Sequence, residues 1–118
     1  MIYIGTDIVS IDRIQQSIDS YSQKFLDKIF TESEINSSKQ RSSIYSHLAG
    51  KFAAKEAVKK AILSSGLVEN ISIKDIEVLS LESGAPMIKL NLDIEYEYIN
   101  ISISHSDTDA IASAIVKP

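Results

Sequence analysis

The sequence of 118 residues predicts an α+β fold from three observations. It opens with an apolar run rich in β-branched residues, which is typical of a strand. Apolar residues at helical spacing then continue as far as Gly66, and beyond it they occur in short runs bounded by turn residues. A strand, several helices and a C-terminal antiparallel meander form an α+β layer arrangement. We expect one domain spanning residues 1–118, a size that suits the 13.0 kDa mass.

The first strand is predicted over residues 1–9. Gly5 interrupts its apolar run, and Asp7 places a single carboxylate within it. Ser10 is a suitable helix N-cap, and it precedes a short amphipathic helix with a polar outer face. The apolar side of this helix consists of Ile11, Ile14, Ile18 and Tyr21.

Two more helical segments are predicted before a polar loop. Residues 24–30 repeat apolar side chains at helical spacing. Thr31 and Glu34 have the spacing of a capping box, which starts another turn or two of helix. The polar residues 36–43 are expected to form a loop.

The longest element is a helix predicted from about Ser43 to Gly66, where glycine suits the C-cap. Alanines line one of its sides and larger apolar residues line another, so we expect contacts on more than one face. The alanines are Ala53, Ala57 and Ala61, and the larger residues are Leu48, Phe52 and Leu63.

Strands are predicted for the rest of the chain. The turn-forming residues 82–86 and 106–109 suit hairpins between successive strands. The predicted strands cover residues 71–81, 87–92, 99–105 and 110–116.

Charge is unevenly distributed along the chain, whose net charge is −4. Residues 1–60 carry 9 Lys and Arg against 7 Asp and Glu, whereas residues 61–118 carry 3 against 9. This asymmetry disfavours non-specific nucleic-acid binding by the whole domain, and it leaves room for an anion site in the first half.

The chain has no cysteine, which excludes disulfides and thiolate ligands and suits a reducing compartment. Its N-terminus lacks the basic start and long apolar run of a signal peptide or membrane span. We therefore expect a cytoplasmic protein without a membrane anchor. Because so short a chain encloses little volume, a multi-residue site is expected to be shared between copies.

Asp7 and Glu56 are the carboxylates that most need an explanation. Asp7 is either capped by backbone N–H groups at the turn into the helix or a ligand for a hard cation. Glu56 either pairs with Lys60 on a solvated helix face or holds Mg²⁺ with a second carboxylate. In the second case phosphates would bind the surrounding lysines, which are Lys51, Lys55, Lys59 and Lys60.

Other catalytic patterns are weak. No Walker loop and no G-x-S-x-G elbow occurs, which disfavours a phosphate-binding loop and a Ser-His-Asp triad. His105 ends a predicted strand at a turn, where a histidine is more often a capped surface residue than a catalyst. His47 lies in the long helix and is given no role.

Three segments together resemble holo-[acyl-carrier-protein] synthase, the short bacterial type of 4′-phosphopantetheinyl transferase. They are residues 5–9 with Asp12-Arg13-Ile14, then Phe52-Ala53-Ala54-Lys55-Glu56-Ala57 with Lys60-Ala61, and Ser102-Ile103-Ser104-His105-Ser106. The resemblance implies transfer of phosphopantetheine from coenzyme A to a serine of apo acyl carrier protein, as required for fatty acid biosynthesis. It also implies release of adenosine 3′,5′-bisphosphate, a requirement for Mg²⁺, and a homotrimer with sites at subunit interfaces.

The resemblance also implies roles for individual residues. Asp7 and Glu56 would be the catalytic metal ligands, and Arg13 would face the carrier protein. Lys24 and Lys28 add positive charge in the next helical segment, which suits a typically acidic carrier. The coenzyme A contacts would be Lys51, Lys55, Lys60, Gly84, Pro86, His105 and Ser106.

The chain departs from the family pattern at three of its positions. Lys51 replaces the usual arginine and loses its bidentate geometry toward phosphate. Ala85 replaces a residue that is often basic, and Ser106 replaces the common threonine but keeps the hydroxyl. Two rival hypotheses use the same residues: a nucleotide pyrophosphatase with water as the nucleophile, and a binding module in which both carboxylates are structural.

Overall fold

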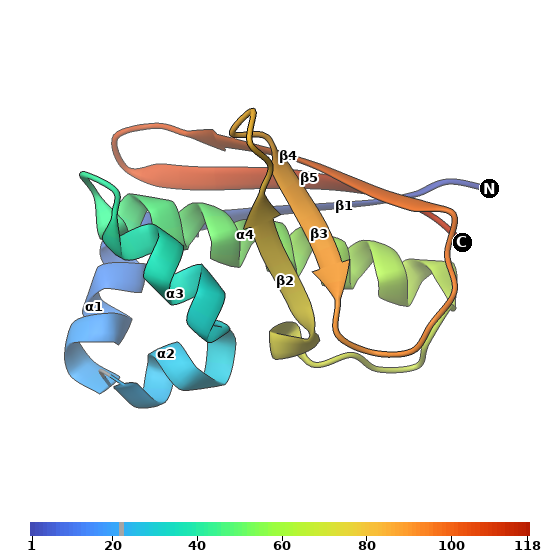
Figure 1. The fold of residues 1–118 in the computed structure, drawn as a ribbon, viewed down its shortest axis with the longest axis horizontal. Coiled ribbons are helices and arrows are strands. Elements are labelled where there is room, and N and C mark those ends of the chain that lie inside the picture. Colours follow the sequence, from blue (N-terminus) through green and yellow to red (C-terminus); the bar gives the residue numbers. More distant parts are fainter. Residues whose placement is uncertain (22) are drawn as a thin grey trace.

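The computed structural model describes residues 1–21 and 23–118, and its elements follow the order predicted from the sequence (Figure 1). The fold is α+β, as predicted. The elements are β1 (Tyr3–Ser10), α1 (Ile11–Tyr21), α2 (Gln23–Ile29), α3 (Glu32–Lys39), α4 (Ile44–Ser65), the 3₁₀ helix η1 (Ile73–Asp75), β2 (Ile76–Ser80), β3 (Pro86–Leu90), β4 (Tyr98–His105) and β5 (Asp109–Lys117).

Three helix caps predicted from the sequence are confirmed. The backbone N–H of Arg13 donates to Ser10 Oγ at 3.3 Å at the start of α1. Thr31 and Glu34 make both hydrogen bonds of a capping box at the start of α3. Gly66 ends α4 with a φ of 78°, a left-handed conformation that glycine adopts without strain.

A three-stranded antiparallel sheet, in the order β1-β5-β4, packs along α4 (Figure 1). The residues of β5 that face α4 are small, and Ala112 and Ala114 are buried against its alanine side. Gly5 of β1 makes the closest approach, because a Cβ there would lie 1.9 Å from the carbonyl oxygen of Ala57. Backbone thus contacts backbone where β1 crosses α4, and no side chain fits between them.

The prediction that all C-terminal strands form one meander is wrong. Strand β5 pairs with β4 on one edge and with β1 on the other, so the chain's first strand completes that sheet. Strands β2 and β3 form a separate two-stranded sheet that crosses α4 in the view of Figure 1. This separate sheet covers another apolar side of α4, where Val78 and Ile88 share the core with Val58 and Ile62.

Two predicted boundaries also differ from the structure. Residues 36–39 belong to α3 rather than to a loop, and the hydroxyls of Ser37 and Ser38 donate to the Glu34 carbonyl oxygen one turn earlier. The strand predicted to begin at residue 71 begins at Ile76, because a turn of 3₁₀ helix precedes it.

A buried ion pair joins α3, α4 and β2. Lys55 Nζ lies 2.6 Å from Glu34 Oε1, and both side chains are inaccessible to solvent. Glu34 also accepts the backbone N–H groups of Thr31 and Val78, each at 2.8 Å. Lys55 donates further to the carbonyl oxygen of Ile29 at 2.6 Å. Burial lowers the pKa of Lys55, and the neighbouring carboxylate of Glu34 opposes that shift.

The sheet face opposite α4 is apolar and exposed. Ile4 and Ile8 of β1 are 71% and 66% exposed, and their register partners Ile115 and Ile111 of β5 are each 40% exposed. Within residues 1–21 and 23–118, no element covers these four side chains. No helix of the described chain has the length and apolar character needed to cross a bilayer.

Candidate functional site

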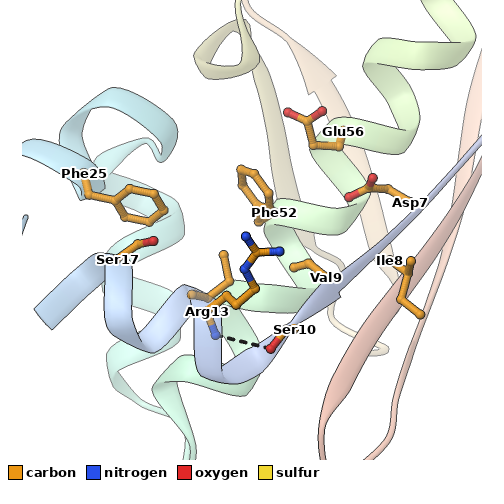
Figure 2. Close-up of a pocket in the computed structure, with 10 residues that line it drawn as sticks. Asp7, Ile8, Val9, Ser10, Arg13, Ser17, Phe25, Phe52 and Glu56 are labelled. Atoms are coloured by element: carbon orange, nitrogen blue, oxygen red, sulfur yellow. Dashed lines mark hydrogen bonds between the residues drawn. The ribbon is translucent and has the colours of Figure 1, made fainter. Parts of the chain in front are cut away.

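The two predicted metal ligands lie in one cavity of about 420 Å³, here called the carboxylate pocket (Figure 2). Asp7 comes from the middle of β1, and Glu56 comes from α4. Arg13 of α1 lines the same pocket, beside the apolar side chains of Phe25 and Phe52. The structure therefore joins three residues that the sequence analysis connected only through a resemblance.

Lys60 forms an ion pair with Asp7 beside this pocket. Its Nζ lies 3.1 Å from Asp7 Oδ1 and 3.0 Å from the carbonyl oxygen of Thr6. Among the described residues, neither the alternative in which turn amides cap Asp7 nor the alternative in which Glu56 pairs with Lys60 is observed. Lys60 lies one turn beyond Glu56 on α4, on the side where β1 crosses, so the strand supplies its partner.

The donor set of the carboxylate pocket fits one Mg²⁺ ion. Asp7 and Glu56 offer hard carboxylate oxygens, and no cluster of three or more Asp, Glu, His or Cys residues occurs in the described part of the chain. Mg²⁺ is commonly held by one or two carboxylates, with water and substrate phosphates completing its coordination. Two carboxylates facing an open cavity leave room for such a substrate.

Other predicted residues gather in a second cavity of about 330 Å³, here called the histidine pocket. It is lined by Lys51, Gly84, Pro86 and His105, which come from α4, the turn before β3, β3 itself and the end of β4. Four residues that are up to 54 positions apart in the sequence thus line one cavity. No acidic residue lines this cavity among the described residues, which suits an anionic ligand.

Arg41 and His47 also line the histidine pocket, and the sequence analysis assigned neither to a site. The positive charge of the first half of the chain was a signal for Arg41, whereas nothing in the sequence distinguished His47. Burial lowers the pKa of His47 to about 4, and the charges of Lys51, Arg41 and His105 contribute to this shift. The ring therefore stays neutral at physiological pH.

His105 is held by a backbone carbonyl of α4. Its Nε2 lies 3.0 Å from the carbonyl oxygen of Ser46. Because a carbonyl oxygen only accepts, Nε2 must carry the hydrogen and donate it. The adjacent Ser106 lies outside the histidine pocket, and its Oγ instead accepts the backbone N–H groups of Thr108 and Asp109 at 3.2 and 3.0 Å.

Lys51 and Lys55, two of the predicted coenzyme A contacts, are buried. Lys51 is only 3% exposed, and its ammonium donates to the Glu34 carbonyl oxygen at 3.1 Å and to Ser37 Oγ. Burial lowers the pKa of Lys51. Lys55 is fully buried in its ion pair with Glu34 and lines neither pocket. This structure therefore does not place Lys55 where a ligand could touch it.

The three cations predicted to face a carrier protein lie around one aromatic side chain. Lys24 and Lys28 line a cavity of about 440 Å³ with Tyr21 and Phe25. Phe25 also lines the carboxylate pocket, together with Arg13. Within the described residues the guanidinium of Arg13 makes no ion pair.

Comparison with known proteins gives consistent matches over nearly the whole chain. Residues 3–116 match the 4′-phosphopantetheinyl transferase superfamily. The chain is 39% identical over 115 residues to the holo-[acyl-carrier-protein] synthase of Chlorobaculum tepidum, covering 98% of this chain and 97% of that protein. It is 44% identical over 88 residues to the synthase of Protochlamydia amoebophila, covering 75% and 71%.

Solved structures of similar proteins share the fold. The Helicobacter pylori holo-[acyl-carrier-protein] synthase in complex with coenzyme A superposes with a TM-score of 0.81 at 36% identity, covering 97% of this chain and 99% of that one. The Bacillus anthracis synthase, also described in complex with coenzyme A, gives 0.81 at 35% identity, covering 98% and 95%.

Proposed function

The chain belongs to the 4′-phosphopantetheinyl transferase superfamily, and we propose that it is a holo-[acyl-carrier-protein] synthase that uses the carboxylate pocket for catalysis. It transfers 4′-phosphopantetheine from coenzyme A to a serine of apo acyl carrier protein and releases adenosine 3′,5′-bisphosphate. The observation that carries this proposal is the placement of Asp7 and Glu56 on one open cavity, with Lys60 paired to Asp7.

The residues suit phosphoryl transfer. The serine oxygen of the carrier attacks the phosphorus that bears pantetheine, and the bond from that phosphorus to the bridging oxygen of the pyrophosphate breaks. Negative charge develops on the leaving phosphate, where the ammonium of Lys60 can neutralise it. When bound, Mg²⁺ supplies further charge neutralisation, with Asp7 and Glu56 as its ligands. The serine proton goes to Glu56, to water or to another carboxylate.

We further propose that each site combines pockets from two copies. Phe52 and Glu56 line the carboxylate pocket from one side of α4, whereas Gly50 and Lys51 line the histidine pocket from positions roughly 100° to 160° away around the helix, at about 100° per residue. One substrate therefore cannot contact both pockets of a single chain directly across the helix. The exposed isoleucines of β1 and β5 provide an apolar surface for contact between copies. The homotrimer that the resemblance implies would satisfy both observations.

The coenzyme A contacts are proposed at the histidine pocket. Gly84, Pro86 and His105 line that cavity together with Arg41. Lys60, which pairs with Asp7, is proposed to meet the pyrophosphate. Lys51 shapes the wall of the histidine pocket while its ammonium is bound internally. The cytoplasmic location and the role in fatty acid biosynthesis stay predictions.

The carrier protein is proposed to dock beside the carboxylate pocket. Arg13, Lys24 and Lys28 surround Phe25 there and offer positive charge to an acidic partner. This arrangement would bring the carrier serine next to Asp7 and Glu56.

One assay tests the proposed function against its rivals. The protein is incubated with coenzyme A, Mg²⁺ and an apo acyl carrier protein, and carrier mass and coenzyme A are both followed. We expect the carrier to gain the mass of one phosphopantetheine group as coenzyme A is consumed. Loss of coenzyme A without a carrier mass gain would instead indicate a pyrophosphatase. No change in either would indicate a binding module.

A further inference from the structure

Helix α4 contains a glycine, Gly50, at a buried position in its first half. Glycine destabilises a helix interior relative to alanine, so its presence there needs a reason. Backbone conformation is not the reason, because the glycines with positive φ in the described chain are Gly66 and Gly84. The reason must be the space that a side chain would fill.

That space is occupied by the ring of His105. A Cβ on Gly50 would lie 2.6 Å from Nε2 and 3.0 Å from Cε1 of His105, and 3.1 Å from Cγ2 of Ile103. All three atoms belong to side chains of β4, and none belongs to the backbone. The imidazole therefore rests directly on the α4 backbone at Gly50, and one added methyl group would displace the ring.

A hydrogen bond fixes the ring in this position. His105 Nε2 donates to the carbonyl oxygen of Ser46, at 3.0 Å and one turn before Gly50 on the same helix. A side chain at position 50 would displace His105 Nε2, which is the atom that makes this hydrogen bond. Packing against Gly50 and the hydrogen bond to Ser46 thus together set the orientation of the imidazole.

We propose that Gly50 is a positioning residue, which seats His105 so that its imidazole faces the coenzyme A that the histidine pocket binds. This inference rests on the proposed function, since it takes coenzyme A as the ligand. Gly50 and His105 line that pocket together with the cations Arg41 and Lys51, and an anionic ligand is the class that such a lining favours. Gly50 itself touches no ligand in this account and acts through His105.

The proposal predicts that Gly50→Ala weakens coenzyme A binding without lowering the stability of the protein. In Gly50→Ala the helix gains a better helix former, and the ring at the end of the His105 side chain yields rather than the backbone. We expect the urea midpoint to stay unchanged or rise. The KM for coenzyme A should rise about 3- to 10-fold, as for one weakened hydrogen bond, with kcat within about twofold of the parent.

A double-mutant cycle with His105→Ala tests the coupling. Once the ring is absent, adding Gly50→Ala should change the KM for coenzyme A by less than about 1.5-fold, because the added methyl has nothing to displace. Ser64→Ala, at an exposed position of α4 outside both pockets, is the matched control and should leave the KM unchanged. Nitrogen NMR of His105 gives a readout without coenzyme A: the parent should show Nε2–H, and Gly50→Ala should lose that preference.

The outcomes separate the two claims. A KM increase that persists in the His105→Ala background, or an unchanged KM in Gly50→Ala, would overturn the positioning role while coenzyme A binding by the parent still supports the proposed function. If the parent fails to bind coenzyme A, the proposed function falls, and the role of Gly50 toward that ligand falls with it. The nitrogen spectra then still show whether Gly50 seats the ring.

Discussion

Lys60 and Asp7 show what the sequence could not reveal about single residues. They are separated by 53 positions and meet only because β1 crosses α4. Helical spacing favoured Glu56 as the partner of Lys60, since neighbours on one helix are the contacts that a sequence displays directly. The resemblance predicted Asp7 and Glu56 as ligands, whereas the residues alone left both carboxylates open. Their placement in one cavity supports the ligand role.

The carboxylates give the first prediction. Asp7→Asn and Glu56→Gln should each lower Mg²⁺-dependent transfer by at least about 100-fold, because neutral amides are poor ligands for a hard cation. Far-ultraviolet circular dichroism should stay as in the parent, since both side chains line an open pocket. Turnover is measured at limiting Mg²⁺. Near-parental turnover of either variant would remove that residue from the metal site.

Buried lysines were the main error at this scale. The resemblance implied that Lys51 and Lys55 contact coenzyme A, yet both side chains face α3 and are buried. Their partner is Glu34, which the capping-box pattern had already assigned to the start of α3. Glu34 both completes the capping box and binds the two lysines. Its contacts with the lysines depend on tertiary packing, which no local sequence pattern contains.

His47 gives a prediction about pH. Its pKa falls from 6.5 in the unfolded chain to about 4 in the fold, so the unfolded state binds more protons between these values. Stability should therefore fall as pH decreases from about 6.5 to about 4. His47→Phe should reduce this loss by about 1–2 kcal/mol, allowing for solvent screening of a partly exposed ring. The free energy of unfolding is measured in urea for parent and variant across this pH range. An equal loss of stability in the two proteins would contradict the role of His47.

At the scale of elements, local signals were reliable and sheet pairing was not. Ser10, Thr31 and Gly66 marked helix ends correctly because each cap involves residues a few positions apart. The order of strands in space depends on partners that are distant in sequence, such as β1 with β5. Alternation of apolar residues predicts a strand, but it does not say which edge that strand joins.

Gly5 gives a prediction about the packing of β1 on α4. Gly5→Ala should lower the free energy of unfolding by about 3 kcal/mol or more, because the new methyl would meet the backbone of Ala57 rather than a movable side chain. Urea unfolding at one fixed protein concentration measures the change. Ser72→Ala, at an exposed cap that makes no side-chain hydrogen bond, should change stability by less than about 0.5 kcal/mol. Equal stability of parent and Gly5→Ala would contradict the close approach.

At the scale of the whole molecule, charge distribution gives a prediction about the carrier protein. The surface around Arg13, Lys24 and Lys28 lies in the net-positive half of the sequence. Arg13→Glu should raise the KM for the carrier protein about tenfold and make the rate less sensitive to salt, because complementary charge steers encounter. Coenzyme A binding should not change. An equal effect on both substrates would assign Arg13 to the coenzyme A site or to the fold.

The separation of the two pockets explains why so small a chain would need a second copy. One side of α4 presents the carboxylates and the other presents the histidine pocket, while the isoleucines of β1 and β5 offer a surface for association. The size of the chain suggested a shared site from the start. The resemblance implies that Asp7 and Glu56 come from one copy and the His105 or Gly84 region from another. Local sequence patterns alone contain no such assignment, because it depends on the faces that α4 presents.

The measurement that tests this account most directly is complementation between two inactive variants. Asp7→Asn disables the carboxylate pocket, and His105→Glu places a negative charge in the histidine pocket where phosphates are proposed to bind. The two proteins are mixed, unfolded and refolded together, and phosphopantetheine transfer to the carrier is measured against each variant refolded alone. If sites form between copies, random assembly should restore about a quarter of parental activity, since that share of sites combines two intact pockets. If the mixture is no more active than the separate variants, the account of a site shared between copies is wrong.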